Sequence, residues 1–327
     1  INSTLSFNTH CMYSDSIIGC FIVGSAGNVL HTTNYGNNWR QISLEGDLKF
    51  ISFTDQNTGW ISGSAGKIYK TTNGGINWVL LQTNIANHLN SHYFINSNTG
   101  WFAGQNNALF KTTNSGLSFD STMISGNIQE VYFTDALKGF VIRDYNTISY
   151  PYFCINKRFI SKTTNGGLNW VDVKSESEDC HGWEFKYKSI KFTSPADGYA
   201  VSSTGDFLIT SDSGNTWWNN GSPGRIPLNN LYFKNVNSGW VVGDNGIMLT
   251  MGDAIIGINN LYEITPERFE LLQNYPNPFN SSTSIKFRIN KPEHVKLSVF
   301  DISGKEIFVL MNSSMNPGVY DFNFDGT

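Results

Sequence analysis

The sequence predicts an all-β protein, a single β-propeller followed by a small β-domain, and three observations lead to that fold class. A unit of roughly forty residues recurs up to residue 250, a period typical of propeller blades. Charged residues make up only 15% of the 327 residues, whereas about 25% is usual in soluble domains. Short runs rich in aromatic and β-branched residues alternate with Gly and Asn, as in chains of short strands joined by tight turns.

Each unit is expected to hold four strands, and six units align. The first strands are predicted at residues 1–7, 48–53, 89–94, 128–133, 187–192 and 228–233. The second strands open at Gly19, Gly59, Gly100, Gly139, Gly198 and Gly239, in most units as the first member of a Gly-aromatic pair. Five fourth strands begin at Trp39, Trp78, Phe119, Trp170 and Trp217. We therefore expect a six-bladed propeller over residues 1–254, with a seventh, upstream blade as the alternative.

The sixth unit is incomplete, because its third strand at residues 246–251 is not followed by the usual turn and aromatic strand. Propellers avoid an open edge when a strand from the other terminus completes the last blade. Ile1 falls at the start of the first predicted strand. We therefore expect a strand upstream of this sequence to complete the sixth blade.

The turn between the third and fourth strands carries the most specific local pattern, Thr-Thr-Asn-Gly-Gly-Ile-Asn-Trp at residues 71–78. A short Asx side chain can accept backbone N–H groups within such a turn, and glycine takes the positive φ. The turn resembles the Asp-box, or BNR, repeat. Its Asx positions are Asn34, Asn73, Asn114, Asn165 and Asp212. We interpret them as structural and not catalytic, because a repeated Asx turn is explained by folding.

The complete repeat, Gly-Trp through Thr-Thr-Asn-x-Gly to Trp, is similar to the BNR-like propellers of the photosystem II assembly factor family. The resemblance covers about residues 1–250. It implies the fold, but it does not imply one function, because repeats of this kind occur with unrelated activities.

Blade four departs from the pattern through an insertion rich in aromatic residues at 143–157 and a long connection at 175–184. Both are expected on one face of the propeller, where aromatic rings with a polar rim suit a glycan or a peptide. The candidate ligand-binding residues are Arg143, Tyr145, Tyr150, Tyr152, Arg158, His181 and Trp183. The alternative is that these rings pack the insertion onto the propeller, since a long loop needs a small core of its own.

Four cysteines are compatible with two disulfides in an oxidising compartment. We predict one disulfide between Cys154 and Cys180, which lie in the two irregular segments of blade four. A second is predicted between Cys11 and Cys20 in the first hairpin. Buried free thiols are the alternative.

The pattern changes after residue 254, where a linker at 255–270 is expected to lead to a domain at 271–327. Gln-Asn-Tyr-Pro-Asn-Pro-Phe-Asn at 273–280, followed by alternating strands and Asp-Ile-Ser-Gly-Lys-Glu at 301–306, closely resembles the C-terminal sorting domain of the Por (type IX) secretion system. That resemblance implies a Bacteroidetes-like bacterium, the secretion machinery as a partner, and a secreted or cell-surface location. The segment 317–326 departs from the family's last strands, so we expect this β-sandwich to be incomplete.

The sequence does not favour several classes of function. A net charge of −4 does not favour nucleic acid, and no apolar run reaches the length of a membrane span. The six histidines form no zinc pattern, so no metal or cofactor is predicted. A sialidase needs three convergent arginines, and the propeller holds only Arg40, Arg143, Arg158 and Arg225. We predict a non-catalytic, secreted binding module; the alternatives are a sialidase-like glycan hydrolase and a structural surface-layer or filament subunit.

Overall fold

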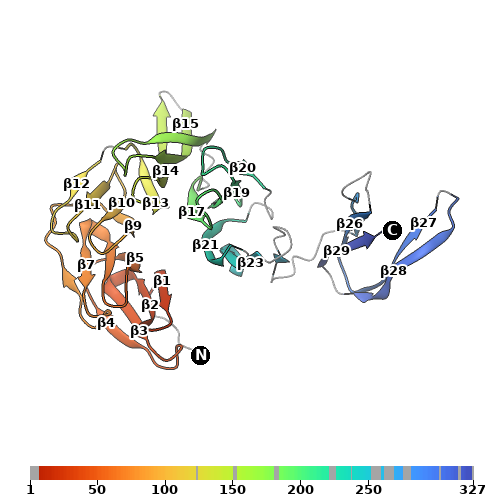
Figure 1. Ribbon diagram of the computed structural model, residues 1–327, viewed down its shortest axis with the longest axis horizontal. Coiled ribbons are helices and arrows are strands. Elements are labelled where there is room, and N and C mark those ends of the chain that lie inside the picture. The colour runs from red at the N-terminus through yellow and green to blue at the C-terminus, as the bar shows by residue number, and fades with distance from the viewer. Residues whose placement is uncertain are drawn as a thin grey trace. The chain divides into compact units, whose positions relative to one another are not determined.

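The structure, a computed structural model, describes residues 7–122, 124–149, 153–179, 184–220, 226–236, 238–251, 259–260, 269–274, 281–301, 303–315 and 318–325 (Figure 1). The chain forms two compact units. One contains Ile1–Asn245 with Met251–Gly257, and the other contains Gly246–Thr250 with Ile258–Thr327.

Six four-stranded sheets form the six blades of a propeller, as the repeat predicts. Blades one to three consist of β1 (Thr9–Asp15), β2 (Gly19–Gly24), β3 (Asn28–Thr32), β4 (Arg40–Ser43), β5 (Leu48–Phe53), β6 (Gly59–Gly63), β7 (Ile68–Thr71), β8 (Val79–Leu80), β9 (Leu89–Phe94), β10 (Gly100–Gly104), β11 (Leu109–Thr112) and β12 (Asp120–Ser121). Blades four to six consist of β13 (Asn127–Phe133), β14 (Gly139–Ser149), β15 (Phe153–Thr163), β16 (Val171–Asp179), β17 (Tyr187–Phe192), β18 (Gly198–Ser202), β19 (Phe207–Thr210), β20 (Trp218–Asn219), β21 (Leu228–Asn235), β22 (Ser238–Gly243), β23 (Met248–Met251) and β24 (Asn259–Asn260). Short 3-10 turns, η1 (Ser25–Gly27), η2 (Ser64–Gly66) and η3 (Asp244–Gly246), join the second and third strands of blades one, two and six.

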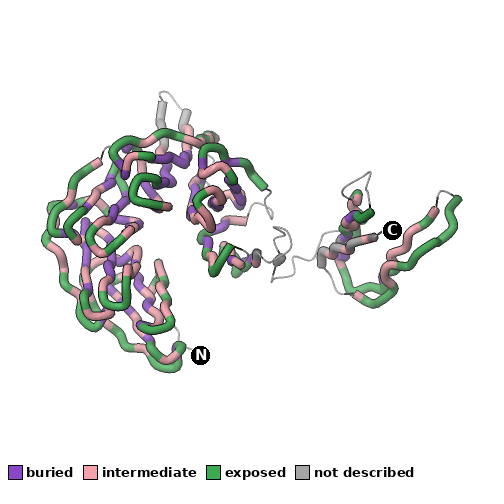
Figure 2. The backbone as a smooth tube through the Cα atoms, viewed as in Figure 1, coloured by how far each residue is buried: buried purple, intermediate pink, exposed green. Residues whose placement is uncertain are grey.

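Aromatic stacking links consecutive blades. In blades one to five, an aromatic residue near the start of the second strand lies against the aromatic residue near the end of the first strand of the next blade. Ring centroids are 3.7 Å apart for Trp60 and Phe94 and 3.6 Å apart for Trp101 and Phe133. Figure 2 shows the buried residues along the strands of these sheets. The repeated Gly-aromatic pair of the sequence is therefore the contact that holds neighbouring blades together.

The first strand of blade one is expected at residues 1–7, of which 1–6 lie outside the described residues, whereas the structure has this strand at Thr9–Asp15. The assignment of the second strand also shifts by one residue. Cys20 pairs with Thr32, as Gly59 pairs with Thr71 in blade two, so Cys20 occupies the glycine position and Phe21 the aromatic position. Gly19 is an additional residue of this hairpin, and it displaced the sequence alignment.

The predicted disulfide between Cys11 and Cys20 is also wrong, because both thiols are free. Cys11 lies opposite Val23, and Cys20 lies opposite Ser14. Three residues of strand separate the two positions, about 10 Å, and a disulfide requires Cα atoms closer than roughly 7 Å. Burial raises the pKa of the Cys11 thiol to about 11.

Blade six has a fourth strand within this chain, contrary to the expectation of an upstream strand. β24 pairs with β23, with Asn260 opposite Leu249 and Asn259 opposite Thr250. The strand contains two asparagines, which have low strand propensity, and it falls within the predicted linker. Composition therefore gave no indication of it.

The five Asp-box turns share one hydrogen-bond pattern. In blade two, Thr71 donates to Asn73 Oδ1 at 2.9 Å, and Thr71 Oγ1 accepts the N–H of Gly75 at 3.0 Å. Asn73 Oδ1 also accepts the N–H of Asn77 at 3.0 Å. These bonds close the turn internally, which agrees with the structural role assigned to its Asx residue.

After blade six, the second unit contains two small sheets: β25 (Glu270–Leu271), β26 (Ser282–Ile289) and β29 (Gly318–Asp325) in one, and β27 (Glu293–Phe300) and β28 (Glu306–Met315) in the other. Phe287, Ile289 and Val295 form the centre of their common core. These two sheets form the small β-domain expected after the propeller.

Candidate functional site

The insertion of blade four is an extension of its sheet. β14 and β15 each have 11 residues and β16 has 9, whereas the corresponding strands of blade three have 5, 4 and 2. The extended strands carry the described members of the predicted ligand-binding set, Arg143, Tyr145 and Arg158. Four other members, Tyr150, Tyr152, His181 and Trp183, lie outside the described residues. So does Cys180, and the disulfide with Cys154 stays a prediction.

Strand alternation divides the three described candidates between two faces of the sheet. Asp144 lies opposite Arg158 in the antiparallel pair of β14 and β15, so these two side chains lie on the same face of the sheet. Arg143 and Tyr145 belong to the other face. The structure thus places Arg143 and Tyr145 on one face of this sheet and Arg158 on the other, because β14 and β15 are regular strands at this point.

Arg143 is only 6% exposed, and its guanidinium is engaged within the blade. Nη2 donates to Asp172 Oδ1 at 2.7 Å, Nε donates to Ser161 Oγ at 3.0 Å, and Nη1 donates to the carbonyl oxygen of Ser125 at 2.9 Å. The guanidinium also lies 4.1 Å from the ring centre of Phe159. Its charge is thus neutralised by Asp172 at the edge of the site.

Arg158 connects blade four to blade five. It donates to Glu176 Oε2 through Nε at 2.8 Å and to Asp206 Oδ2 through Nη2 at 2.7 Å. The rings of Phe185 and Tyr187 lie 4.1 and 4.5 Å from its guanidinium carbon. Burial opposes ionisation of Asp206, but hydrogen bonds from neighbouring hydroxyls and the charge of Arg158 bring its pKa to about 2. This arginine therefore joins two blades and has little capacity left for a ligand.

The carboxyl group of Asp144, on the face of the sheet that carries Arg158, is also hydrogen-bonded within blade four. Asp144 is 4% exposed and accepts a hydrogen bond from Gln129 Nε2 at 2.6 Å. Burial raises the pKa of its carboxyl.

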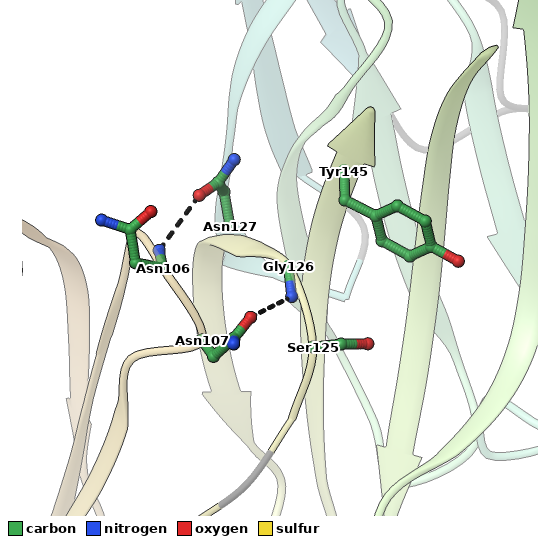
Figure 3. Close-up of a pocket in the computed structure, with 6 residues that line it drawn as sticks. All are labelled: Asn106, Asn107, Ser125, Gly126, Asn127 and Tyr145. Carbon is green, nitrogen blue, oxygen red and sulfur yellow. Dashed lines mark hydrogen bonds between the residues drawn. The ribbon is translucent and has the colours of Figure 1, made fainter. Parts of the chain in front are cut away.

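A hollow of about 700 Å³ lies beside Tyr145, on the other face of β14 (Figure 3). One side of the Tyr145 ring is supported by Phe159, with 5.2 Å between ring centres. The remaining lining consists of amide, hydroxyl and backbone groups, and we call this cavity the amide hollow. Its lining residues are Asn106, Asn107, Ser125, Gly126, Asn127 and Tyr145.

The amide hollow occurs where blade three departs from blades one, two and six. Blades one, two and six have glycine, Gly27, Gly66 and Gly246, at the third position of the turn between their second and third strands. A Cβ atom at Gly27 or Gly66 would lie 1.9 or 1.8 Å from a carbonyl oxygen of the connection to the next blade. Blade three has Asn107 there, with a φ of 64°. The Cβ atom of Asn107 therefore excludes so close an approach of a carbonyl oxygen at this position. The N–H of Asn107 still donates to the carbonyl oxygen of Gly126 at 2.9 Å, as the N–H of Gly66 does to that of Asn87 at 2.8 Å.

The side chain of Asn107 also holds the connection between blades three and four. The N–H of Gly126 donates to Asn107 Oδ1 at 2.7 Å, and the N–H of Asn106 donates to Asn127 Oδ1 at 3.1 Å. Both bonds are drawn in Figure 3. These asparagines are not among the residues predicted from the sequence, although Gln-Asn-Asn at 105–107, in place of the Ser-Ala-Gly of blades one and two, is a signal that the sequence contains.

A second hollow, of about 330 Å³, adjoins the first. Ser125 lines both cavities, and Arg143 with its partner Asp172 contributes to the second. The other lining residues come from the connection and from the Asp-box turn of blade four: Ile124, Leu168, Asn169 and Trp170. We call this cavity the rim hollow.

Metal-ligand clusters and membrane-spanning helices are both absent from the described part of the chain. Among the residues that the structure describes, no three His, Cys, Asp or Glu side chains are grouped so that they could hold a metal ion. In the same part of the chain, no helix is long and apolar enough to cross a membrane.

Comparisons with known families agree with both resemblances. Two overlapping segments, residues 6–81 and 44–128, match the family described as photosynthesis system II assembly factor YCF48. Residues 273–323 match the secretion system C-terminal sorting domain. The chain thus combines a propeller of BNR-type repeats with a type IX sorting domain, which directs export to the cell surface or the extracellular space.

Individual relatives are more distant. The photosystem II assembly lipoprotein Ycf48 of Picosynechococcus sp. is 32% identical over 62 residues, which is 18% of each chain. The GH74 enzyme of Niastella koreensis has a TM-score of 0.57 at 14% identity, over 86% of this chain and 50% of that one. The WD40 repeats of RRP9 have a TM-score of 0.60 at 6% identity, over 80% and 81%. These structural likenesses establish the propeller fold alone.

Proposed function

We propose that this protein is a secreted, non-catalytic binding module that holds a glycan in the amide hollow between blades three and four. The observation that carries this proposal is the lining of the hollow. It offers an aromatic ring supported from behind, together with asparagine amides and a serine hydroxyl. Amides and hydroxyls can donate to and accept from sugar hydroxyls, while a ring face packs against the apolar face of a sugar.

The charged groups around the hollow favour an uncharged ligand. Arg143 and Arg158 are both paired with carboxylates of the same protein. A third convergent arginine is not available from the described part of blade four, and the two arginines lie on opposite faces of one sheet. This arrangement supports binding of neutral hydroxyl groups better than the sialidase alternative, which needs arginines that converge on a carboxylate.

Binding to a printed array of neutral and acidic oligosaccharides, beside an array of extended peptides, tests the proposal. Wild-type protein is expected to bind neutral oligosaccharides. Tyr145→Ala should lower their affinity at least tenfold, about 1.4 kcal/mol. Tyr145→Phe, which keeps the ring, and Tyr35→Ala, which removes a ring that is 98% exposed in blade one, serve as controls.

Two outcomes would contradict the proposal. Equal affinity of Tyr145→Ala and wild type would remove the amide hollow from consideration. Binding confined to peptides would assign the module to a protein partner. The hydrolase alternative is tested on the same probes, because chromatography after incubation would reveal shorter products only if bonds are cleaved.

A further inference from the structure

The rim hollow continues the amide hollow along one face of blade four. Ser125 lines both cavities, and its carbonyl oxygen accepts a hydrogen bond from Arg143 Nη1 at 2.9 Å. Tyr145 lines the amide hollow, and Arg143 lines the rim hollow. These two residues are two positions apart on β14, which places them on one face at a spacing of about 7 Å. A ligand that reaches both cavities must therefore consist of more than one sugar unit.

The rim hollow offers contacts of the same chemical kind as the amide hollow. Asp172 is 41% exposed, and its Oδ1 accepts from both Arg143 Nη2 at 2.7 Å and Ser161 Oγ at 2.6 Å. Both bonds end on Oδ1, and no described residue donates a hydrogen bond to Oδ2, which can accept one from a ligand hydroxyl. Asn169 is exposed and adds an amide. A pre-oriented carboxylate that is already neutralised by an arginine suits a hydroxyl donor and disfavours an acidic ligand.

An apolar contact completes the rim hollow. Leu168, which is 71% exposed, and Trp170 lie in the Asp-box turn that borders it. The Trp170 indole donates to the carbonyl oxygen of Gly167 at 3.1 Å, which fixes the ring in the turn. Blade two has Ile76 and Asn77 at the positions of Leu168 and Asn169, and both are exposed.

We propose that the two cavities are subsites of one elongated site, and that the protein recognises a linear, uncharged oligosaccharide of at least two sugar units. One unit lies against Tyr145 in the amide hollow, and the next contacts Asp172, Asn169 and Leu168 in the rim hollow. This inference rests on the proposed glycan-binding function and adds the form of the ligand. It also gives the Asp-box turn of blade four a second role, as a wall of the site, beside its structural role in the blade.

The test is the dependence of affinity on chain length. Gluco-, manno- and xylo-oligosaccharides of one to six units are titrated calorimetrically into the full chain. Wild-type protein should bind the longer members of one series at least tenfold more tightly than the single sugar. The double variant Leu168→Ala/Asn169→Ala should lose that gain and keep the affinity for the single sugar. The matched double variant Ile76→Ala/Asn77→Ala should behave as wild type.

Each other result is decisive. An unchanged length dependence in Leu168→Ala/Asn169→Ala, or a wild-type affinity independent of length, would overturn the elongated site and leave the proposed function intact. A loss of single-sugar affinity in that variant would show that the two cavities are not separate subsites. Failure of every oligosaccharide to bind would overturn the glycan-binding function itself, and the elongated site with it.

Discussion

At the scale of single residues, one exception in a repeated turn decides where this propeller is hollow. Asn107 occupies a position that is glycine in blades one, two and six, and its side chain holds the neighbouring connection through Gly126. Asn107→Gly removes this hydrogen bond and should let a carbonyl oxygen of the connection approach the turn as closely as in blades one and two. We expect oligosaccharide affinity to fall at least tenfold, measured by calorimetry. Stability should stay within about 1 kcal/mol in urea unfolding, because glycine accepts the positive φ.

The control for this substitution is Ala26→Gly in blade one, which also places glycine at a positive φ, 55°, but in a turn that lines neither cavity. It should leave affinity unchanged. A wild-type affinity in Asn107→Gly would mean that the asparagine does not open the site.

A buried histidine makes a second residue-scale prediction. His92 is 1% exposed, and its ring nitrogens each lie 2.8 Å from a serine hydroxyl, Ser62 on one side and Ser52 on the other. Burial lowers its pKa to about 3, below the usual 6.5. The unfolded chain therefore binds a proton that the folded chain does not, and stability present above pH 6.5 is lost as the pH falls toward 3.

Comparison with His92→Gln isolates this contribution, because the other titrating groups are shared. Between pH 6 and pH 4 the wild-type free energy of unfolding should fall more steeply than that of the variant, by up to about 1.4 kcal/mol per pH unit. Urea unfolding at a series of pH values provides the slopes. Parallel slopes would mean that His92 is protonated in the folded state.

The candidate site was only partly predictable from single residues. Aromatic density pointed to blade four, and Tyr145 of this blade lines a cavity. The aromatic insertion predicts a loop, whereas the structure has two regular strands there. Strand alternation then places Arg143 and Arg158 on opposite faces of the sheet. The cavity itself depends on the distance between a turn and a connection, and composition does not reveal such a distance.

At the scale of elements, the Asp-box turn joins a blade to its predecessor as well as closing itself. Gly75 and Gly36 occupy the same position in blades two and one, with φ of 78° and 82°. A Cβ atom at Gly75 would lie 2.5 Å from the fully buried ring of Phe21 in blade one, whereas at Gly36 the nearest atom is 3.6 Å away, in Trp39. The turn therefore packs against the preceding blade in one case and not in the other.

Alanine at these two glycines should separate backbone strain from packing. Gly36→Ala is expected to cost roughly 1–2 kcal/mol for the left-handed backbone alone. Gly75→Ala should cost about 1–3 kcal/mol more, because Phe21 has no space to move. Urea unfolding followed by tryptophan fluorescence measures both. Equal costs would show that the contact with Phe21 relaxes freely.

The elements that the sequence predicted well are those set by repetition. Gly-aromatic pairs and Thr-Thr-Asx turns fix strand ends in blades two to five, because the same packing recurs there. Blade one shifted where Gly19 adds a residue, and blade six received an unpredicted β24. A second repeated turn was also overlooked: Asp55 Oδ1 accepts two backbone N–H groups at 2.8 Å, and Asp135 does the same in blade four.

At the scale of the whole molecule, the proposed binding site and the sorting domain lie in different parts of the chain. The cavities lie within blades three and four, and the match to the sorting domain covers residues 273–323. The small β-domain has a core of its own, in which Phe287 and Ile289 pack with Val295. Loss of the small domain should therefore affect location without affecting the site.

Deletion of residues 271–327, which retains β24 in blade six, tests this separation in a bacterium that has a type IX secretion system. Immunoblots of medium, protease-treated cells and periplasm should show the full chain outside the cell and the deleted chain in the periplasm. The purified deleted chain should bind the array oligosaccharides with wild-type affinity, and Tyr145→Ala in the full chain, exported normally, is the reciprocal control. Export of the deleted chain would place the sorting information elsewhere, and loss of binding would show that the small domain supports the propeller.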